Sequence, residues 1–380
     1  MSRNRVIYQS EALFVNDGTL IPTAEHPAGN IKQLHRVQSA NYGFSVARQD
    51  VNQFGNLARI DAIILEPPTV NLDFTYYLHT GNNEAALGFS VGTTLGSTLS
   101  FISGLIDSTQ TVDKSTLSGR NFHIYTSPEG NDSSAIAGQN FTGSEASTIT
   151  VGNGYVTNYS VEASVGSLPT VSVSAEGLNI NVVQGNSGTL PSLTVETSAT
   201  GSNFFVLPTP NSGSLGVSAL RPGDIEMVLA DPVLTDMPTG VAGAGSTAAH
   251  IQSFSIEVPI GRTTLQRLGT RFGFAKVIDF PIEVTVNVSA TVADLQNAGN
   301  LVNLINNDTT KNLLFRFKEG VTDKICYEVR GCKLISESFS SSVGDNKSVD
   351  LVFTTQIGAP QDAVNGVFVA TSSAGALALA

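Results

Sequence analysis

The sequence predicts a mainly β protein with two tandem domains, each a β-sandwich or barrel with a short flanking α-helix. Three observations favour this fold class. The chain has 380 residues, which is enough for two domains of ordinary size. Gly, Ser, Thr, Asn and Val dominate, Trp is absent and only 14% of the residues are charged, a composition typical of β-proteins with many turns. The third observation is that one stretch of the chain occurs twice.

The repeated stretch covers residues 37–74, and its second occurrence starts at Ile251. An ungapped shift from 37 to 251, or 214 positions, aligns two runs in which apolar and polar residues alternate. Alternation with a period of two is the pattern of a strand with one buried face. Identical aligned pairs include Gln38 and Gln252, Ser39 and Ser253, Arg48 and Arg262, Gly55 and Gly269, Pro67 and Pro281, and Val70 and Val284.

Two further blocks follow in the same order in both repeats. Residues 120–125 resemble 311–317 at a shift of 191 positions, and residues 160–166 match 338–344 at a shift of 178 positions. The shrinking shift predicts that the first repeat carries loop insertions between the blocks. Any two β-rich segments can resemble each other by chance, but three collinear blocks favour an internal duplication.

The duplication suggests domain boundaries. Residues 1–180 are expected to form the first domain with an N-terminal arm, and residues 251–380 the second domain with a C-terminal tail. Residues 181–250, dense in Gly, Ser, Thr and Pro, are expected to form a connector with strands that can join the second domain. Within the arm, one strand is expected near residues 12–15, without a core of its own.

Each repeat is expected to contain a strand, a polar loop and a second long strand. In the first repeat the strands are predicted at residues 42–47 and 69–78, with the loop at residues 48–59 between them. This loop is much longer than a tight hairpin turn, and loops of that size often have a function. One short helix is expected in each repeat, within residues 80–119 and over residues 292–305.

Sequence motifs of enzymes are missing. The five histidines share no metal-ligand spacing, and two cysteines alone do not make a zinc site. Neither a nucleophile elbow nor a phosphate-binding glycine loop occurs. The acidic pairs Asp107/Asp113 and Asp224/Glu226 fall in polar loops, where carboxylates are usually solvated. We therefore expect a non-enzymatic protein with no catalytic residue, no bound metal and no cofactor.

Charge, cysteine content and the absence of long apolar runs limit the partners and the cellular compartment expected for this protein. The net charge of −12 argues against a nucleic-acid-binding surface, because such surfaces neutralise phosphates. The N-terminus lacks the apolar core of a signal peptide, and no run approaches the length of a membrane span. Cys326 and Cys332 would lie about 20 Å apart on a straight strand, too far for a disulfide. Two free thiols are favoured, and a disulfide would need a tight turn at Arg330-Gly331.

The segments RVQSANYGFSVARQDVNQFGNLARIDAIILEPPTVNLDFTYYL and NYSVEASVGSLPTVSVSAEGLNI resemble tail tube proteins of long-tailed bacteriophages. The resemblance covers most of residues 30–180 and, more weakly, residues 251–358. It implies small β-sandwiches with a flanking helix, and rings in which the inner strands of six domains join into one barrel. Some members of this family carry two tube domains in one chain and close the ring with three chains, which the duplication resembles.

The predicted strands are consistent with a barrel that lines a DNA channel. One face of each strand is apolar, while the other carries small, hydroxylated or acidic side chains without Lys or Arg, and such a wall repels phosphate. If four strands per domain line the channel, the resemblance implies about 24 strands and a backbone diameter of roughly 45 to 50 Å. The alternative is that these faces simply meet bulk water. The candidate lumen-facing residues are Asn71, Asp73, Thr75, Ser172, Ser174, Glu176, Glu283, Thr285, Asn287 and Ser289.

The two long polar loops are the candidate contacts between stacked rings, as the resemblance suggests. Phe54 and Leu268 are expected to be buried anchors there, and Gly55 and Gly269 to permit the turn back. The N-terminal arm and the C-terminal tail are second candidates for contacts between subunits. The candidate stacking residues are Arg48, Asp50, Asn52, Gln53, Phe54, Gly55, Arg262, Gln266, Leu268 and Gly269.

The resemblance also implies partners and a location. The expected partners are further molecules of this chain and other tail proteins: the tape measure, the baseplate or tip, the terminator and, in a contractile tail, the sheath. Viral DNA would pass through without specific binding, and no membrane is involved. The protein would be assembled in the host cytoplasm and reside in the virion tail. A baseplate hub or tube-initiating ring is the first alternative. A surface-layer protein or adhesin fits the composition but lacks an export signal.

Overall fold

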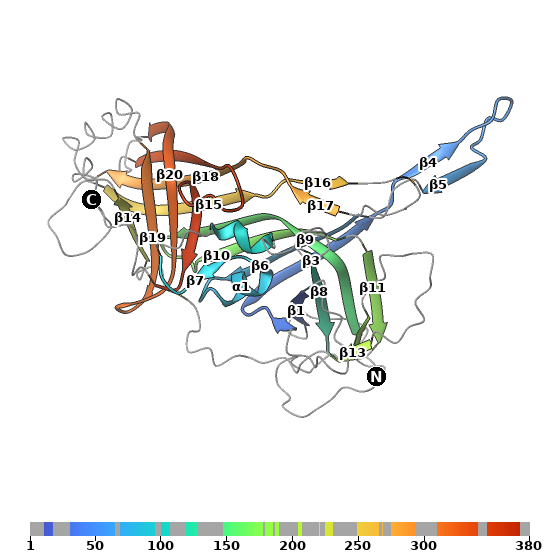
Figure 1. Cartoon of the computed structure of the whole chain (residues 1–380), viewed down its shortest axis with the longest axis horizontal. Coiled ribbons are helices and arrows are strands. Elements are labelled where there is room, and N and C mark those ends of the chain that lie inside the picture. The colour runs from blue at the N-terminus through green and yellow to red at the C-terminus, as the bar shows by residue number, and fades with distance from the viewer. Residues whose placement is uncertain are drawn as a thin grey trace.

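The structure is a computed structural model in which the chain is mainly β (Figure 1). The residues that it describes are 11–17, 31–64, 69–95, 100–106, 119–127, 147–177, 179–184, 187–189, 204–206, 220, 225–230, 249–265, 268, 275–292, 310–340 and 348–372. Gln266, Gly269, nearly all of the helix expected over residues 292–305 and the end of the C-terminal tail lie outside the described residues.

An antiparallel main sheet runs through both halves of the chain. Its first half has the order β3-β6-β10-β9, and its second half continues with β15-β18-β21-β20. Strands β9 and β15, which are distant in sequence, therefore pair at the middle of the sheet, and we call this pairing the internal seam. The strands are β3 (Val37–Ser45), β6 (Thr69–Tyr77), β9 (Ser147–Ser164), β10 (Thr170–Gly177), β15 (Ala249–Pro259), β18 (Ile282–Val292), β20 (Thr322–Ser340) and β21 (Ser348–Ile357).

Outer strands cover one face of the main sheet. The long strands β9 and β20 connect the layers, because each pairs with outer strands along its first part and with the main sheet along its second. The outer strands of the first half are β1 (Glu11–Asp17), β2 (Lys32–Gln33), β8 (Arg120–Thr126) and β11 (Asn179–Gln184). Those of the second half are β14 (Ile225–Ala230), β19 (Lys311–Glu319) and β22 (Gly366–Ala370), which pairs with β7 (Val91–Gly92) of the first half.

Three small hairpins and two short helical segments complete the described fold. The helix predicted within residues 80–119 corresponds to α1 (Asn82–Leu87), followed by the 3₁₀ helix η2 (Phe101–Leu105). The segment predicted as a polar loop over residues 48–59 instead contains β4 (Arg48–Val51), which pairs with β5 (Asp61–Ile64). The other hairpins are β16 (Arg262–Leu265) with β17 (Ala275–Ile278) and β12 (Ser187–Thr189) with β13 (Phe204–Val206).

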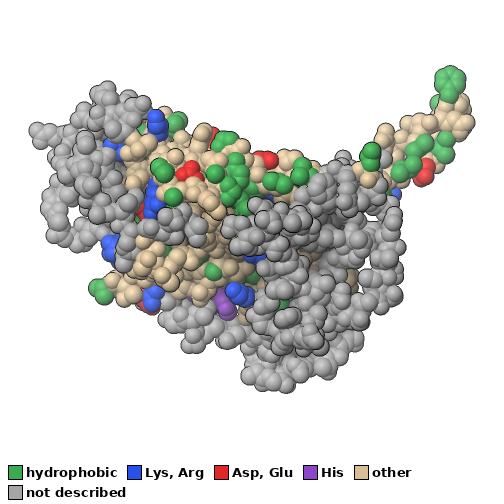
Figure 2. Space-filling model, in the orientation of Figure 1, with side chains coloured by type: hydrophobic (Ala, Val, Ile, Leu, Met, Phe, Trp, Pro, Cys, Tyr) green, Lys and Arg blue, Asp and Glu red, His purple; other side chains and the backbone are tan. Residues whose placement is uncertain are grey.

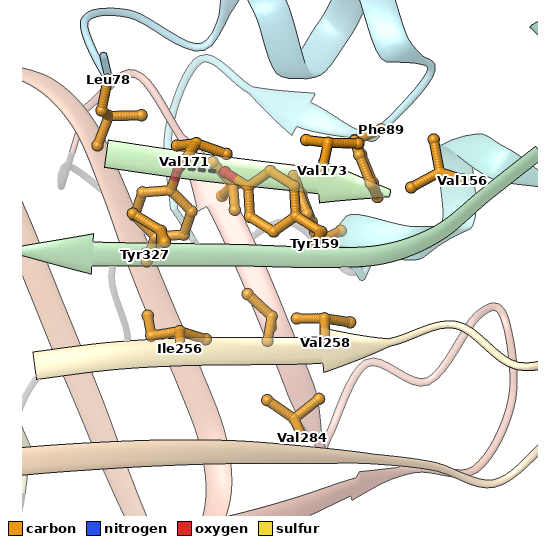
Figure 3. Close-up of a cluster of buried hydrophobic side chains, with 14 of the residues drawn as sticks. Leu78, Phe89, Val156, Tyr159, Val171, Val173, Ile256, Val258, Val284 and Tyr327 are labelled. Carbon is orange, nitrogen blue, oxygen red and sulfur yellow. Dashed lines mark hydrogen bonds between the residues drawn. The ribbon is translucent and has the colours of Figure 1, made fainter. Parts of the chain in front are cut away.

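One large hydrophobic cluster extends through both halves, beside a small separate one formed by Leu95, Leu314, Cys326 and Ala370. The inward side chains of the main sheet, such as Leu72 and Val286, belong to one cluster with the outer strands. Figure 3 shows this core at the internal seam, where Tyr159 of β9 and Tyr327 of β20 share a hydrogen bond of 2.7 Å between their hydroxyl groups. The N-terminal strand β1 also contributes, because Leu13 and Val15 are buried in the same cluster. The strand expected near residues 12–15 is therefore present, and it packs into the shared core rather than a core of its own.

The pairing register of the first half recurs in the second. Leu72 lies opposite Ala175, and Val286, 214 positions beyond Leu72, lies opposite Phe353, 178 positions beyond Ala175. Irregularities recur as well. In the pairing of β3 with β6, Gln38 has no opposite residue, and in the pairing of β15 with β18 the same holds for Gln252. The same holds one strand pair further on, where β9 skips Thr157 and β20 skips Ile335.

The recurrence extends to a strand that sequence comparison did not align. Val15 of β1 lies opposite Phe122, while Leu229 of β14 lies opposite Leu313. The shift from 15 to 229 is again 214 positions, and the shift from 122 to 313 is 191. Strand β14, which the sequence placed in the connector, thus occupies in the second half the position that β1 has in the first.

Candidate self-assembly surfaces

The exposed face of the main sheet is polar and acidic. The candidate lumen-facing residues are all exposed or half-buried. They are also neighbours: Thr75 lies opposite Ser172, Asp73 opposite Ser174 and Asn71 opposite Glu176. The ten residues therefore lie on this one face, which we call the polar face, because side chains alternate across each strand and their sequence neighbours are buried.

The polar face is wider than the sequence prediction. Strands β9, β15 and β21 contribute further polar side chains in register with those predicted, for example Ser160 beside Ser172 and Glu257 beside Thr285. The same alternation marks these strands in the sequence and would have found them. The carboxylates on the face are those of Asp73, Glu162, Glu176, Glu257, Glu283 and Asp350, whereas Lys333 brings a positive charge at its end.

The hairpin β4–β5 extends from the body of the molecule and forms the first arm, residues 48–64 (Figure 1). Its tip is a turn in which the amide of Asn56 donates to the carbonyl of Gln53 at 3.1 Å, and Gly55 has a φ of 95° that favours glycine. Phe54 is 106% exposed in the single chain, and Leu57 is likewise fully exposed. Figure 2 shows hydrophobic side chains on the surface of the projecting arm. The expected burial of Phe54 is thus not met within one molecule.

The hairpin β16–β17 forms the second arm, and its base packs against the first half of the chain. The Nε of Arg262 donates to the carbonyl of Val156 at 3.1 Å, and the guanidinium lies 5.1 Å from the centre of the Tyr155 ring. Burial lowers the pKa of Arg262 to about 10. The ammonium group of Lys276, which is buried, forms an ion pair with Glu176 at 2.5 Å.

The predicted stacking residues of the second arm have different surroundings. Arg262 lies at the base of the arm and contacts the first half of the chain. Leu268 is exposed, like Phe54, and is not a buried anchor within one molecule. In the first arm, Arg48 and Asp50 lie on β4, and Asp50 forms an exposed ion pair with Arg59 at 2.9 Å.

The two ends of the main sheet are open edges. Among the described strands, none pairs with the outer edge of β3 or with the outer edge of the second part of β20. Exposed backbone groups at a sheet edge are a template for a further strand. The inward side chains at these edges are also exposed: Tyr42 is 47% and Phe44 is 67% exposed, while their counterparts Ile256 and Val258 in β15 are both 0% exposed.

A buried polar cluster lies at the internal seam. The carboxyl group of Glu84 on α1 accepts hydrogen bonds from the hydroxyls of Tyr76 at 2.7 Å and Tyr159 at 3.2 Å. Burial raises the pKa of Glu84 to about 7. Tyr159 in turn contacts Tyr327 of the second half. The cluster joins the two halves, and its closed, fully buried geometry indicates a structural role.

Other reactive side chains are also buried. Cys326 and Cys332 are free thiols on the continuous strand β20, as predicted, and burial raises the pKa of Cys332 to about 12. His123 lies 2.9 Å from both Thr150 and Asn16 through its two ring nitrogens, and burial lowers its pKa to about 3. Such groups are inert to solutes in the folded protein.

The described residues contain no cluster of three or more side chains suited to bind a metal ion. None of the helices in the described part of the chain is long and apolar enough to span a membrane. A scan against protein-family models and a search of curated proteins found no match to this chain.

Proposed function

We propose that the protein is a structural component of a bacteriophage tail tube. In this proposal the two halves of the chain are duplicated tube domains, and three chains form a pseudo-hexameric ring. Rings stack into a hollow conduit for the viral genome. The proposal rests on the sequence resemblance and on a physical observation about the main sheet.

The carrying observation is that one uninterrupted sheet has a buried apolar face and an acidic polar face across both halves. A sandwich that only needs solubility can mix both signs of charge on its exposed face. Here the carboxylates outnumber the ammonium groups, and the side chains between them are mostly Ser, Thr and Asn. A surface of this kind repels DNA phosphates, and Lys333 at one end of the sheet is the one cation that the strands named above bring to it, so a duplex can slide past.

The size of the sheet fits the proposal. The eight strands of one main sheet, taken three times, give about 24 strands, which at ordinary strand spacing and tilt closes a barrel roughly 45 to 50 Å across. That diameter leaves room for a duplex inside the lining side chains. The open edges give the means of closure, because a barrel removes every edge of a sheet.

The first arm is the proposed contact between stacked rings. Its tip carries apolar side chains that no part of the described molecule covers, notably Phe54 and Leu57. Exposed aromatic and aliphatic side chains at the end of a projecting hairpin are typical of a site that is buried by a partner. A pocket on the next ring is the partner that the proposal assigns.

Electron microscopy of the purified protein in negative stain tests the proposal. Long hollow tubes with an inner wall of the stated width are the expected result. Single rings that do not stack would favour the tube-initiating ring or hub instead. A protein that stays monomeric at all concentrations, with or without the other tail proteins, would overturn the proposal.

A deletion separates ring formation from stacking. Removing residues 52–56 takes away the tip of the first arm but leaves the β4–β5 pairing and the core intact. We expect folded molecules that form rings but no tubes. Val321→Ser, in the exposed turn between β19 and β20, is the control and should leave tubes unchanged. Tubes of normal length from the first deletion would contradict the stacking role of the arm.

A further inference from the structure

The internal seam provides a template for the contact between two molecules. Because the register of the second half repeats that of the first, β3 is the counterpart of β15 and the second part of β20 is the counterpart of β9. β9 and β15 pair within the chain, whereas β20 and β3 end in open edges. Each molecule thus has one open edge that corresponds to β15, at β3, and one that corresponds to β9, at β20. The two edges lie at opposite ends of its main sheet.

We infer that the β20 edge of one molecule pairs with the β3 edge of a second molecule in the register of the internal seam, and that Arg48 fastens this contact. The inference rests on the proposed function and specifies its lateral contact. It concerns the sides of the ring, and it moves Arg48 from the stacking contacts to the lateral one.

The register follows from the counterparts. Across the internal seam, Ile256 lies opposite Val161 and Glu257 lies opposite Ser160. Subtracting the shift of 214 from β15 and adding the shift of 178 to β9 gives the expected pairs between molecules. These are Asn41 opposite Ser340, Tyr42 opposite Phe339, Gly43 opposite Ser338, Phe44 opposite Glu337 and Ser45 opposite Ser336.

Burial supports a second molecule as the occupant. Tyr42 and Phe44 point to the same side as the core, and a sheet that continued past β3 would cover them as it covers Ile256 and Val258. Phe339 is 42% exposed, while its counterpart Val161 is 0% exposed. Each open edge therefore exposes apolar side chains that pairing with the other edge would bury. Contacts of this head-to-tail kind propagate from molecule to molecule and close into a ring when the rotation permits.

The base of the second arm indicates what Arg48 does. Arg262 donates to the carbonyl of Val156 across the internal seam, and the amide of Ile260 donates to the carbonyl of Thr157 at 2.7 Å. The counterpart of Arg262 is Arg48, and the counterpart of Val156 is Leu334. Arg48 is exposed in the single chain, at the base of the arm that extends from the end of β3 (Figure 1). The second molecule would supply the Leu334 carbonyl as the counterpart of an acceptor that Arg48 does not have among the described residues of its own chain.

One difference separates the two contacts. The aromatic ring over which Arg262 lies belongs to Tyr155, whereas the counterpart of Tyr155 is Lys333. Arg48 would therefore approach a positive charge where Arg262 meets an aromatic face. We expect the contact between molecules to be weaker than the internal seam and to strengthen with ionic strength, since salt screens repulsion between like charges.

Cysteine cross-linking in the full-length protein tests the register. The variant pair Gly43→Cys and Ser338→Cys places thiols opposite each other on the polar face, where a side chain at residue 43 meets no atom within 4 Å. Mild oxidation should yield disulfide-linked oligomers on a non-reducing gel. The matched control, Gly43→Cys with Ser340→Cys, shifts one thiol by two residues and should cross-link several-fold less, because diagonal positions lie farther apart. Cys326 and Cys332 are buried and serve as a common background.

Arg48→Ala tests the fastening role by sedimentation velocity. We expect about a tenfold weaker association, the usual scale for losing a charged hydrogen bond, and no change in melting temperature. Lys324→Ala, which removes a positive charge from the part of β20 that pairs with β19, outside both arms, is the control and should associate like the wild type. Tubes that form while both cysteine pairs cross-link equally, or while Arg48→Ala associates normally, would overturn the inference and leave the proposed function standing. Absence of any association in the wild type would overturn both.

Discussion

Strands β3 and β15 have the same pairing register, the same skipped residue and the same alternation, yet their inward side chains differ in burial. Val258 in β15 is fully buried between β9 and β18, while Phe44 in β3 is 67% exposed. The fold of one molecule therefore explains the apolar side chain of Val258 but not that of Phe44. This difference teaches that the sequence of β3 is suited to a neighbour that the single chain does not contain.

Charge substitutions at Val258 and Phe44 should produce the largest difference between the two strands. Val258→Asp buries an unpaired carboxylate in the core, and we expect a loss of at least about 3 kcal/mol in the free energy of unfolding, or no folded protein. Phe44→Asp should change stability by less than about 1 kcal/mol and abolish association instead. Thermal unfolding by circular dichroism and sedimentation velocity measure the two effects. Equal destabilisation by both substitutions would contradict the comparison.

The cluster around Glu84 predicts a pH dependence of the internal seam. Folding raises the pKa of this carboxyl group from 4.5 to about 7, so the folded state prefers the protonated form. Stability is then full below pH 4.5 and falls by roughly 3 kcal/mol as the pH rises to about 7, above which the effect is constant.

Glu84→Gln keeps an oxygen that accepts from Tyr76 and removes the titration. The free energy of unfolding is measured with urea at pH 5 and at pH 8. The change between the two pH values should be about 3 kcal/mol smaller in Glu84→Gln than in the wild type. Glu162→Gln removes an exposed carboxylate of the polar face and is the control. An unchanged pH dependence in Glu84→Gln would show that another group controls the seam.

Arg262→Ala sharpens the comparison between the two arms. It removes a charged hydrogen bond to Val156 within the chain, and we expect a loss of about 2 kcal/mol in the free energy of unfolding. The same substitution at Arg48 should leave the free energy of unfolding of the monomer unchanged. Urea unfolding at a concentration where the protein is monomeric provides the measurement, and equal losses at the two arginines would contradict the assignment.

The smallest expected effect is a pH dependence of association that depends on Glu337. This residue is the counterpart of Tyr159, its Oε1 has no hydrogen-bond partner among the described residues, and burial raises its pKa. In the inferred contact it lies opposite Phe44, and its neighbour Leu351 is also apolar. Further burial in the contact would raise the pKa of Glu337 again, so association takes up a proton. Association then weakens as the pH rises from the pKa of Glu337 in the free molecule to its higher pKa in the contact.

Glu337→Gln should make association independent of pH in this range, while Asp350→Asn on the polar face should keep the wild-type dependence. Light scattering at pH 5 and pH 8 measures the effect, which we expect to be a few-fold change in the association constant. A wild-type protein that associates more strongly at pH 8 than at pH 5 would contradict this role of Glu337.

Much of the architecture could be read from local pattern. Alternation along residues 69–77 and 170–177 identified which side chains face outward, and every candidate lumen-facing residue lies on the exposed face. The shifts of 214, 191 and 178 positions also agree with the observed pairing registers. These features depend on neighbouring residues in one strand, or on comparing one strand with its repeat, so the sequence contains them directly.

Strand partners and burial at the edges required the tertiary structure. No local pattern predicts that β9 pairs with β15, that β14 takes the place of β1, or that Arg262 lies under one arm while its counterpart Arg48 stays exposed at the other. Pairing joins segments far apart in the chain, and the environment of a side chain depends on which strand lies beside it. The sequence by itself determined two alternating repeats, and only the fold decided which of their edges is closed inside the molecule and which is left open.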